Sequence, residues 1–344
     1  MIPTRWSEPS RLELASVTIV IPTLGRPEKL RRVLDRLDCQ DAEAGSFELI
    51  VVADAKEQEP EALDGALAAR SFPVRRLQAS RPGASAARNL GWRTAGTRLI
   101  LFLDDDVLPE PSLISQHLAW HERYPEDEIG VLGLVRWADE LRVTPFMRWL
   151  EEGIQFDYRR IKGTEAGWGR FYTANVSVKR QMLERAGGFE EEALPFGYED
   201  LDLALRMHEV GFRLLYNPAA AAAHLHPMDL DFWKRRIARI AVSERQFVAM
   251  HPEISPYFFH RFNEAAGGER AKGRGRILAR VPRGFPWLGP RVWSSVDTYF
   301  RQALAPHFLE AWEAAAAPQA TDQRSAEGEG AGRNSSGSSP GGPK

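Results

Sequence analysis

The chain has 344 residues, of which 43% are hydrophobic and 27% are charged, a composition typical of a soluble globular protein. The formal net charge of −2 argues against a nucleic-acid partner, because no overall positive field would attract a phosphate backbone. The single cysteine, Cys39, excludes an intramolecular disulfide framework and favours a reducing compartment. No apolar run approaches the ~18 residues of a membrane span, and residues 1–14 lack the apolar core of a signal peptide, so we expect a cytoplasmic protein.

In the first third of the chain, short apolar runs alternate with helical patterns. Strand patterns cover residues 16–23, 47–54, 73–79 and 99–103, and helical patterns cover residues 27–37 and 85–96. Strands that are apolar along their whole length predict an α/β fold, a mostly parallel sheet with helices on both faces. Ligands of such sheets bind beyond the carboxyl ends of the strands, where Thr23, Asp54 and the run Asp104–Asp106 stand.

The later chain is less regular. Helical patterns follow at residues 113–120 and 199–211, and strand patterns at residues 131–137 and 172–180. Residues 138–170 have several glycines and no clean period, which predicts a mobile segment. Residues 228–314 look mainly helical. Residues 315–344 are rich in Ala, Gly, Ser and Pro, and this composition predicts disorder.

The run LILFLDDDVLP places three adjacent carboxylates after a buried strand, where they repel one another. In an extended chain, Asp104 and Asp106 would point to one side and Asp105 to the other. Two carboxylates on one side can hold Mg²⁺ or Mn²⁺, whose other positions are filled by water and substrate phosphates. The alternative is a solvated loop in which an aspartate caps the helix after Pro109.

Other acidic residues and a histidine pair also allow two interpretations. Asp54, alone after its strand, is either a turn former or an acceptor for the imide N–H of a uracil or thymine ring. Glu199 and Asp200 open a helix, where electrostatics alone favours acidic residues, but a carboxylate in a partly closed site can also act as a general base. His224 and His226 share one side of an extended chain and include a plausible metal ligand, although a lone histidine is more often structural.

Several common motifs are missing from the sequence. No GxGxxG follows the first strand and no GxxxxGK[ST] occurs, which weakens the dinucleotide-binding and P-loop interpretations. No GxSxG occurs either, so the nucleophile of a serine hydrolase is not indicated.

Five motifs resemble, in chain order, those of the family 2 glycosyltransferases of GT-A fold. They are TIVIPTLGR, LIVVAD, GASAARNLGWRTAGTRLILFLDDDVLP, YTANVSVKRQMLERAGGFEEE and FGYEDLDLALRMHEVGFRLLYNPAAAAAHLH, and together they span about Ser16 to Pro227. The resemblance implies a Rossmann-like sheet and an inverting transfer of a sugar from a nucleotide-diphosphate donor, with UDP or dTDP favoured, to an acceptor hydroxyl. It also implies a divalent metal, Mn²⁺ or Mg²⁺, at a DxD motif, and a role such as cell-wall or polysaccharide biosynthesis.

The resemblance assigns roles to individual residues. The nucleotide site would contain Pro22, Thr23, Arg26, Asp54, Arg88, Asp104 and Asp105, and the metal would be held by Asp106, Asp104 and His224. The general base would be Asp200 with Glu199 beside it, and the acceptor would lie near Trp168, Thr173 and Asn175. One departure concerns the second strand, where the family often has two carboxylates. Here Ala53 replaces the first of them, so the nucleoside base stays open.

These assignments also define the expected domains. Residues 1–15 form an N-terminal arm, and residues 16–227 form the GT-A domain, with a nucleotide half over 16–110 and an acceptor half over 111–227. A helical region over 228–314 and a disordered tail over 315–344 follow.

Two other functions are compatible with such a sheet. A sugar-phosphate nucleotidyltransferase would release pyrophosphate, but it should have a Gly-rich basic signature after the first strand, and LGRPEKL is a poor one. A non-catalytic nucleotide-sugar-binding protein would need no base.

For a glycosyltransferase, the acceptor would be a saccharide or a lipid-linked molecule. The basic and aromatic stretch 270–293 suggests a peripheral contact with the inner face of the membrane, and the alternative is a helical subdomain with a solvated basic face.

Overall fold

The computed structural model describes residues 16–43, 45–194, 196–268, 277 and 290–316. The predicted arm over residues 1–15 therefore lies outside the described residues. The same holds for most of the stretch 270–293 and of the tail 315–344. Within the described part of the chain, no helix is both long enough and apolar enough to cross a membrane.

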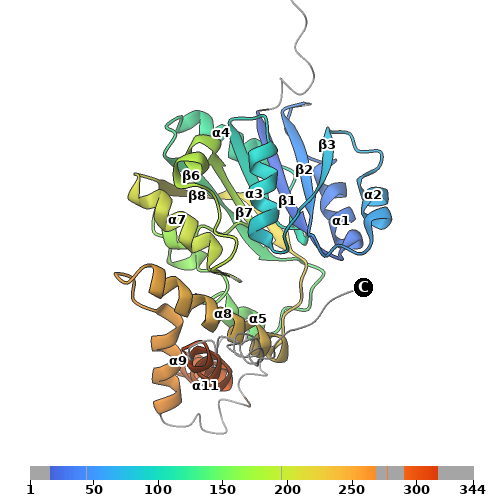
Figure 1. The fold of residues 1–344 in the computed structure, drawn as a ribbon. Coiled ribbons are helices and arrows are strands. Elements are labelled where there is room, and N and C mark those ends of the chain that lie inside the picture. The colour runs from blue at the N-terminus through green and yellow to red at the C-terminus, as the bar shows by residue number, and fades with distance from the viewer. Residues whose placement is uncertain (1–15, 44, 195, 269–276, 278–289, 317–344) are drawn as a thin grey trace, which may run out of the picture.

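The described residues form one eight-stranded sheet in the order β3-β2-β1-β4-β7-β6-β8-β5 (Figure 1). Its strands are β1 (Val17–Thr23), β2 (Phe47–Ala53), β3 (Val74–Gln78), β4 (Leu99–Leu103), β5 (Val107–Pro109), β6 (Ile129–Trp137), β7 (Asn175–Lys179) and β8 (Arg213–His224). The predicted α/β sheet is confirmed, and β1 to β4 are parallel to one another. The other half is mixed, because β7 runs antiparallel to both β4 and β6. Asn175, where β7 begins, pairs with Leu103, where β4 ends, so β7 starts at the carboxyl edge and runs back.

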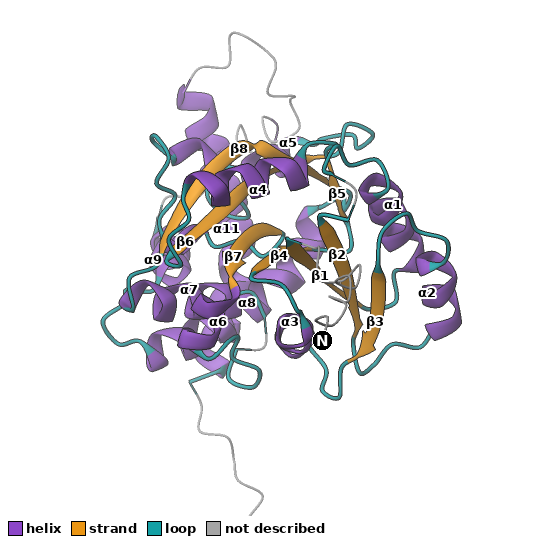
Figure 2. Cartoon of the chain, turned by 90° about the horizontal axis from the view of Figure 1, so that it is seen from above, coloured by secondary structure: helices purple, strands orange, loops and turns teal. Residues whose placement is uncertain are grey.

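Helices cover both faces of the sheet (Figure 2). They are α1 (Pro27–Leu37), α2 (Pro60–Leu67), α3 (Ala84–Thr94), α4 (Leu113–Arg123), α5 (Pro145–Leu150), α6 (Arg180–Ala186), α7 (Glu199–Glu209), α8 (Leu230–Met250), α9 (Tyr257–Gly267) and α11 (Pro290–Ala314), with the short 3₁₀ helices η2 (Tyr158–Arg160) and η3 (Trp168–Arg170). Side chains alternate along β1: Ile19 packs in one core cluster with Leu30 of α1, and Val20 packs in another with Trp92 of α3. The apolar strand therefore builds two cores, one on each face.

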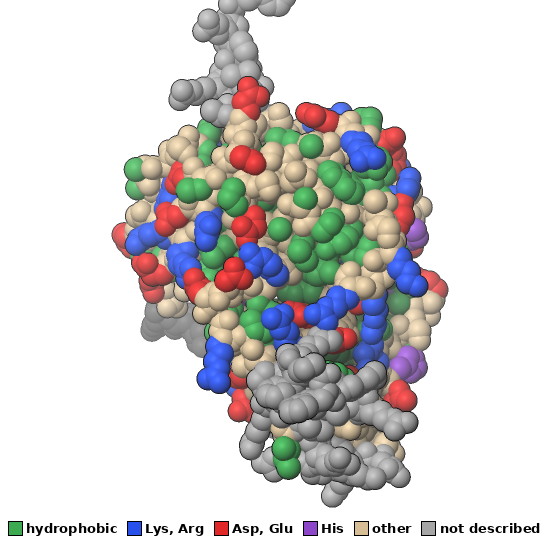
Figure 3. Space-filling model, turned by 180° about the vertical axis from the view of Figure 1, so that it is seen from behind, with side chains coloured by type: hydrophobic (Ala, Val, Ile, Leu, Met, Phe, Trp, Pro, Cys, Tyr) green, Lys and Arg blue, Asp and Glu red, His purple; other side chains and the backbone are tan. Residues whose placement is uncertain are grey.

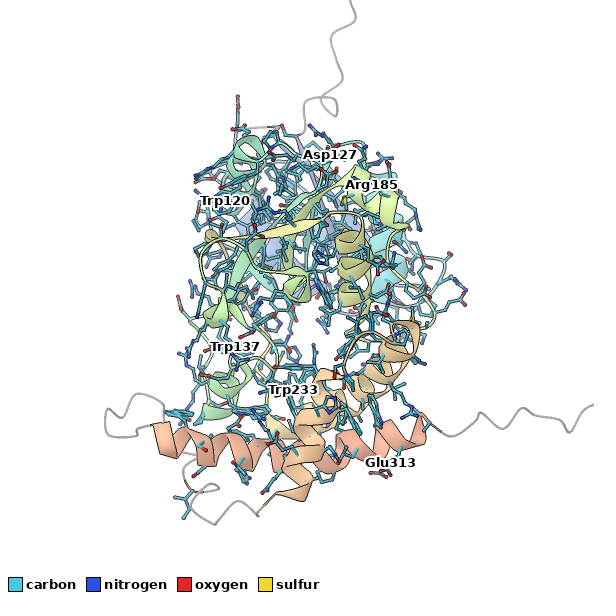
Figure 4. All side chains as sticks on the ribbon, turned by 90° about the vertical axis from the view of Figure 1, so that its left-hand side faces the viewer. Trp120, Asp127, Trp137, Arg185, Trp233 and Glu313 are labelled. Atoms are coloured by element: carbon cyan, nitrogen blue, oxygen red, sulfur yellow. The ribbon has the colours of Figure 1, made fainter. Side chains whose placement is uncertain are left out.

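A third apolar cluster lies below the sheet and contains α5, α8, α9 and α11 (Figure 1). Trp233 of α8 is fully buried in this cluster, between Trp137 at the end of β6 and helix α11 (Figure 4). Phe146 of α5 contacts Phe300 of α11, with ring centroids 5.0 Å apart. Viewed from behind, acidic and basic side chains are interspersed over much of the body, in keeping with the net charge near zero (Figure 3).

The segment 138–170, for which we expected mobility and no regular element, contains α5, η2 and η3. The Thr144 hydroxyl accepts a hydrogen bond of 3.2 Å from the Met147 N–H, which caps α5. Trp149 donates a hydrogen bond of 2.9 Å to Asp297, a residue of α11. The helix depends on partners far along the chain, so a local sequence pattern does not reveal it.

The bulge in β6 is a sensitive point for stability. The register with β8 shifts between Gly133 and Leu134, and a Cβ on Gly133 would lie 2.3 Å from the Ala220 carbonyl oxygen and 2.2 Å from the Asn175 amide nitrogen. We expect Gly133→Ala to lower the free energy of unfolding by about 1–3 kcal/mol, because the backbone must shift. Urea denaturation would measure this. The control is Gly96→Ala, whose Cβ meets no atom within 4 Å, and equal stability of the two variants would contradict the prediction.

Candidate active site

A pocket of about 1150 Å³ opens at the carboxyl ends of β1, β2 and β4. Helices α7 and α8 and the segment around η3 supply its other walls. The predicted site residues that line it are Pro22, Thr23, Arg26, Asp54, Arg88, Asp104, Asp105, Asp106, Trp168, Thr173, Glu199, Asp200 and His224. Polar residues from three strand ends therefore meet at one edge, as the strand pattern predicted.

Asn175 is placed elsewhere. Its side chain is fully buried in the sheet, where its amide donates to the carbonyl oxygens of Ala220 and Leu134, at 2.9 and 3.3 Å. Its carbonyl oxygen lies 2.9 Å from His117 Nε2. Asn175 thus satisfies buried polar groups of the core, and it does not belong to the described lining of the pocket.

The three adjacent aspartates do not continue the strand. Strand β4 ends at Leu103, and the Val107 N–H donates to the Asp104 carbonyl oxygen at 3.2 Å, which closes a turn. The alternation expected of an extended chain therefore stops. Arg26 Nη1 contacts both Asp105 and Asp106, at 3.1 and 3.0 Å. A guanidinium shared by two neighbouring carboxylates reduces their mutual repulsion.

Asp105 is the aspartate that is tied most closely to the strand ends. The Thr23 hydroxyl, at the end of β1, donates a hydrogen bond of 2.8 Å to it. Burial raises the pKa of Asp105 to about 7, although the charge of Arg26 acts in the opposite direction. The carboxyl is thus held between β1 and the start of α1, and its charge is only partly compensated.

Asp106 lies among cations and histidines. Its carboxylate is 3.0 Å from Arg26 Nη1 and 3.7 Å from Lys29 Nζ, and these charges together with His224 keep its pKa below the usual value although burial acts to raise it. His224 Nε2 is 3.7 Å from one carboxylate oxygen and His226 Nδ1 is 3.8 Å from the other. Burial lowers the pKa of both imidazoles, that of His226 to about 4, which favours their neutral forms.

This donor set fits a divalent cation that is completed by a substrate. Neutral imidazole and carboxylate oxygen are the forms that bind metals, and Mg²⁺ and Mn²⁺ commonly take only one or two carboxylates from the protein. Asp106 and His224 would supply one ligand of each kind. Among the described residues, no group of three or more His, Cys, Asp or Glu could hold a metal ion by itself. The remaining ligands would have to be water or phosphate oxygens.

Arg88 connects the end of β4 to the start of α7. Its guanidinium donates to Asp104 at 3.1 Å and to Glu199 at 3.3 Å, and Asp200 lies 3.6 Å away. Burial acts to lower the pKa of Arg88, but the charges of Asp200, Asp104 and Glu199 outweigh it and raise the pKa. This buried arginine therefore compensates three carboxylates from two distant parts of the chain.

Asp200 and Glu199 are adjacent but differ in their bonding. Both oxygens of Glu199 are occupied, one by Arg88 and the other by the Gly197 N–H at 2.5 Å. Asp200 Oδ2 accepts hydrogen bonds from the Thr173 hydroxyl and N–H, at 2.8 and 3.2 Å, while Oδ1 is buried without a hydrogen-bond partner. Burial raises the pKa of Asp200 to about 7, Glu199 adds to this effect, and Arg88 opposes it. Of the two, Asp200 has the oxygen that is free to accept a proton.

Residues of α8 fix the turn that leads into these carboxylates. The Ser243 hydroxyl accepts a hydrogen bond of 3.1 Å from the Phe196 N–H, and the Tyr198 hydroxyl donates one of 2.5 Å to Glu244. Glu244 also accepts from two N–H groups at the start of α9. Sequence reasoning missed these residues, because the helical pattern of 228–314 does not show which face meets the pocket.

Asp54 organises the loops beside the pocket. Its two carboxylate oxygens accept hydrogen bonds from the Lys56 N–H at 2.8 Å and the Gly83 N–H at 2.6 Å. Gly83 has a φ of +114°, which favours glycine, and the close approach fixes the start of α3. The turn-forming interpretation of Asp54 is therefore confirmed, and its proposed contact with a nucleoside base stays a prediction.

The sequence that builds this pocket is similar to that of known glycosyltransferases. The family model described as "Glycosyltransferase like family 2" matches residues 15–242. Validoxylamine A glucosyltransferase of Streptomyces hygroscopicus subsp. jinggangensis is 24% identical over 278 residues, which cover 71% of this chain and 63% of that protein. Pre-mycofactocin glycosyltransferase of Mycobacterium tuberculosis is 27% identical over 246 residues, which cover 71% of this chain and 50% of that protein. The chain thus spans less than two thirds of the length of these relatives.

Solved structures share the fold. A mannosyltransferase of Pyrobaculum calidifontis, in complex with GDP-Man and Mn²⁺, superposes with a TM-score of 0.58 at 18% identity, over 89% of this chain and 90% of that one. Residues 1–349 of TarS from S. aureus, in complex with UDP, superpose with a TM-score of 0.51 at 16% identity, over 87% and 90%. At these identities the likeness concerns the fold alone, and it agrees with the expected GT-A architecture.

The raised pKa of Asp200 predicts a pH-dependent cost in stability. Its carboxyl binds a proton more tightly in the folded chain, with a pKa of about 7, than in the unfolded chain, with the ordinary value of 3.8. The free energy of unfolding should therefore fall as the pH rises between these two values. We expect Asp200→Asn to raise the Tm relative to the unmodified chain, and to raise it more at pH 8 than at pH 5, in scanning calorimetry.

The control for this experiment is Asp231→Asn. Asp231 is exposed, and its pKa is lowered by a hydrogen bond from Lys234, so this variant should not raise the Tm at either pH. A Tm for Asp200→Asn at or below that of the unmodified chain at pH 8 would contradict the prediction.

Proposed function

The chain belongs to glycosyltransferase-like family 2, and we propose that it transfers a sugar from a nucleoside-diphosphate donor to an acceptor hydroxyl with inversion at the anomeric carbon. The observation that carries this proposal is that one pocket holds both a carboxyl oxygen without a hydrogen-bond partner and a carboxylate beside an imidazole, groups of the kind that bind a divalent cation. The first is Asp200 Oδ1, and the second is Asp106 with His224. Transfer with inversion needs a base on one face of the sugar and a stabilised leaving group on the other.

The donor is a nucleoside diphosphate sugar by this proposal. The structural relatives were solved with GDP-Man and with UDP, which supports this donor class without selecting a base. The nucleoside would lie near Pro22, Thr23 and Asp54, at the ends of β1 and β2. UDP and dTDP remain the nucleotides that the sequence favours. Residues further into the pocket would select the sugar.

A divalent metal is part of the proposal, and Asp106 and His224 would hold it, whereas Asp104, which the sequence also offers as a ligand, accepts a hydrogen bond from Arg88. When bound, such an ion neutralises charge on the diphosphate as the bond to the sugar breaks. Mn²⁺ or Mg²⁺ fits the oxygen and nitrogen ligands, and the solved mannosyltransferase contains Mn²⁺. Arg26 and Lys29, which contact Asp106, would hold this carboxylate ionised and in place.

The protein's own groups would then perform the proton transfer. Asp200 Oδ1 takes the proton from the acceptor hydroxyl while that oxygen forms its bond to the anomeric carbon. The bond from the anomeric carbon to the diphosphate oxygen breaks, and its electron pair stays on the diphosphate. The two hydrogen bonds from Thr173 keep the Asp200 carboxyl oriented, and Trp168 and Thr173 line the wall where an acceptor would lie.

Nucleotide binding tests the donor site directly. We expect one of UDP, dTDP and GDP to bind in isothermal calorimetry with Mn²⁺, and to bind at least tenfold more weakly with a chelator. Asp106→Asn should lose this dependence on the metal, because it removes the carboxylate charge, whereas Asp139→Asn, at an exposed position, should keep it. If the folded chain binds none of the three nucleotides with Mn²⁺, the proposed function is wrong.

The pH profile tests the base. Because Asp200 must be ionised to accept a proton, kcat/KM should fall about tenfold per pH unit below pH 7. Asp200→Asn should lower turnover by about 10²–10⁴-fold. Thr173→Val removes a hydrogen bond that lowers the pKa of Asp200, so the acidic limb should move to higher pH. An unmoved limb in this variant, or full turnover in Asp200→Asn, would remove Asp200 from this role.

A further inference from the structure

Arg236 of α8 stands in the pocket without an acidic partner. Its side chain stacks on two rings, with Cζ 4.6 Å from the Phe196 centroid and 5.5 Å from the Trp233 centroid. Its Nε is buried and has no hydrogen-bond partner, and no described carboxylate lies within ion-pair distance of it. The two rings therefore hold a guanidinium that donates no hydrogen bond to any of the described residues.

The charges that face Arg236 identify its surroundings. Burial lowers the pKa of Arg236 to about 10, while the charges of Asp104, Glu199 and Asp106 act to raise it. The group is still charged at pH 7. It thus lies near the carboxylates at the end of β4 and the start of α7, yet forms an ion pair with none of them. A desolvated cation without a partner is costly, and an anionic ligand would relieve this cost.

The other arginines of this part of the pocket are already compensated. Arg26 pairs with Asp105 and Asp106, and Arg88 pairs with Asp104 and Glu199. Arg239 stacks on the same Phe196 ring at 4.1 Å, but it is exposed, so water can solvate its charge. Arg236, by contrast, is partly buried and forms no ion pair with a described carboxylate.

We propose that Arg236 binds the diphosphate of the donor and stabilises the charge that the leaving diphosphate gains. This inference rests on the proposed function, which assigns Asp104 and Asp106 to the donor. A diphosphate next to these carboxylates and their cation would come within reach of the guanidinium, whose planar fork matches phosphate oxygens. By this proposal the diphosphate lies between the turn that follows β4 and residues of α8, so α8 completes the donor site.

The packing of the helices below the sheet determines where Arg236 lies. Arg236 lies beyond Pro227, where the five motifs end, but within residues 15–242, which the family model matches. Trp233, one turn earlier on α8, is fully buried between the pocket and the third apolar cluster. The packing of α8 thereby sets the place of the guanidinium.

The experiment compares the nucleoside diphosphate that binds the unmodified chain with the matching monophosphate, both in the presence of Mn²⁺. We expect Arg236→Gln to weaken the diphosphate at least tenfold and the monophosphate less than twofold, and Arg236→Lys to give an intermediate loss. The control is Arg245→Gln, which removes a charge from the same helix where the side chain stacks on Trp312, and it should leave both affinities unchanged.

Each other outcome overturns the assignment. Unchanged diphosphate affinity in Arg236→Gln would remove the residue from the diphosphate site. A raised KM for the acceptor in the same variant would place it at the acceptor instead. An equal loss for monophosphate would indicate damage to the nucleoside site, and an equal loss in Arg245→Gln would indicate a general effect of charge. If the unmodified chain binds no nucleoside diphosphate, the proposed function itself fails, which the first titration distinguishes from a failure of Arg236 alone.

Discussion

The structure depends on the compensation of carboxylates that are buried together at one edge of the sheet. The ends of β1 and β4 and the start of α7 bring the aspartates 104–106, Glu199 and Asp200 to one pocket. Arg26 and Arg88 are the cations that make this possible, because each contacts carboxylates from more than one residue. Arg88 also joins β4 to α7, which lie about a hundred residues apart in the sequence. Without these ion pairs the acidic cluster would be strongly destabilising.

The sheet and its polar edge could be predicted because they follow from local patterns. Apolar runs such as that before Asp104 define strands, and parallel strands with intervening helices put their carboxyl ends at one edge. The side on which each aspartate points could not be predicted, since β4 ends at Leu103 and a turn follows. Asn175 shows the same limit: its position on β7 is local, but its contacts with His117 and Ala220 come from neighbouring elements.

The helices below the sheet could be predicted as helices but not as parts of the site. A helical pattern states which residues share a face, and it does not state what that face meets. Ser243 and Glu244 hold the turn before α7, and these contacts cross about 46 residues of sequence. Arg236 stands out because it is partly buried and has no acidic partner among the described residues. This property depends on the three-dimensional structure and cannot be read from a helical pattern.

Two buried atoms of opposite character in the pocket have no hydrogen-bond partner among the described residues, Asp200 Oδ1, which has only Arg88 Nη1 at 3.6 Å, and Arg236 Nε. If both served stability alone, pairing them with neighbouring groups would lower the free energy of the folded chain. They lie on different elements, α7 and α8, and Arg88 divides its charge among Asp104, Glu199 and Asp200. A carboxyl that can take a proton and a cation that can take an anion are the two groups that must act at opposite ends of the reacting bond when a hydroxyl displaces a diphosphate. The cost in stability at each group is therefore consistent with selection for a single reaction that uses both.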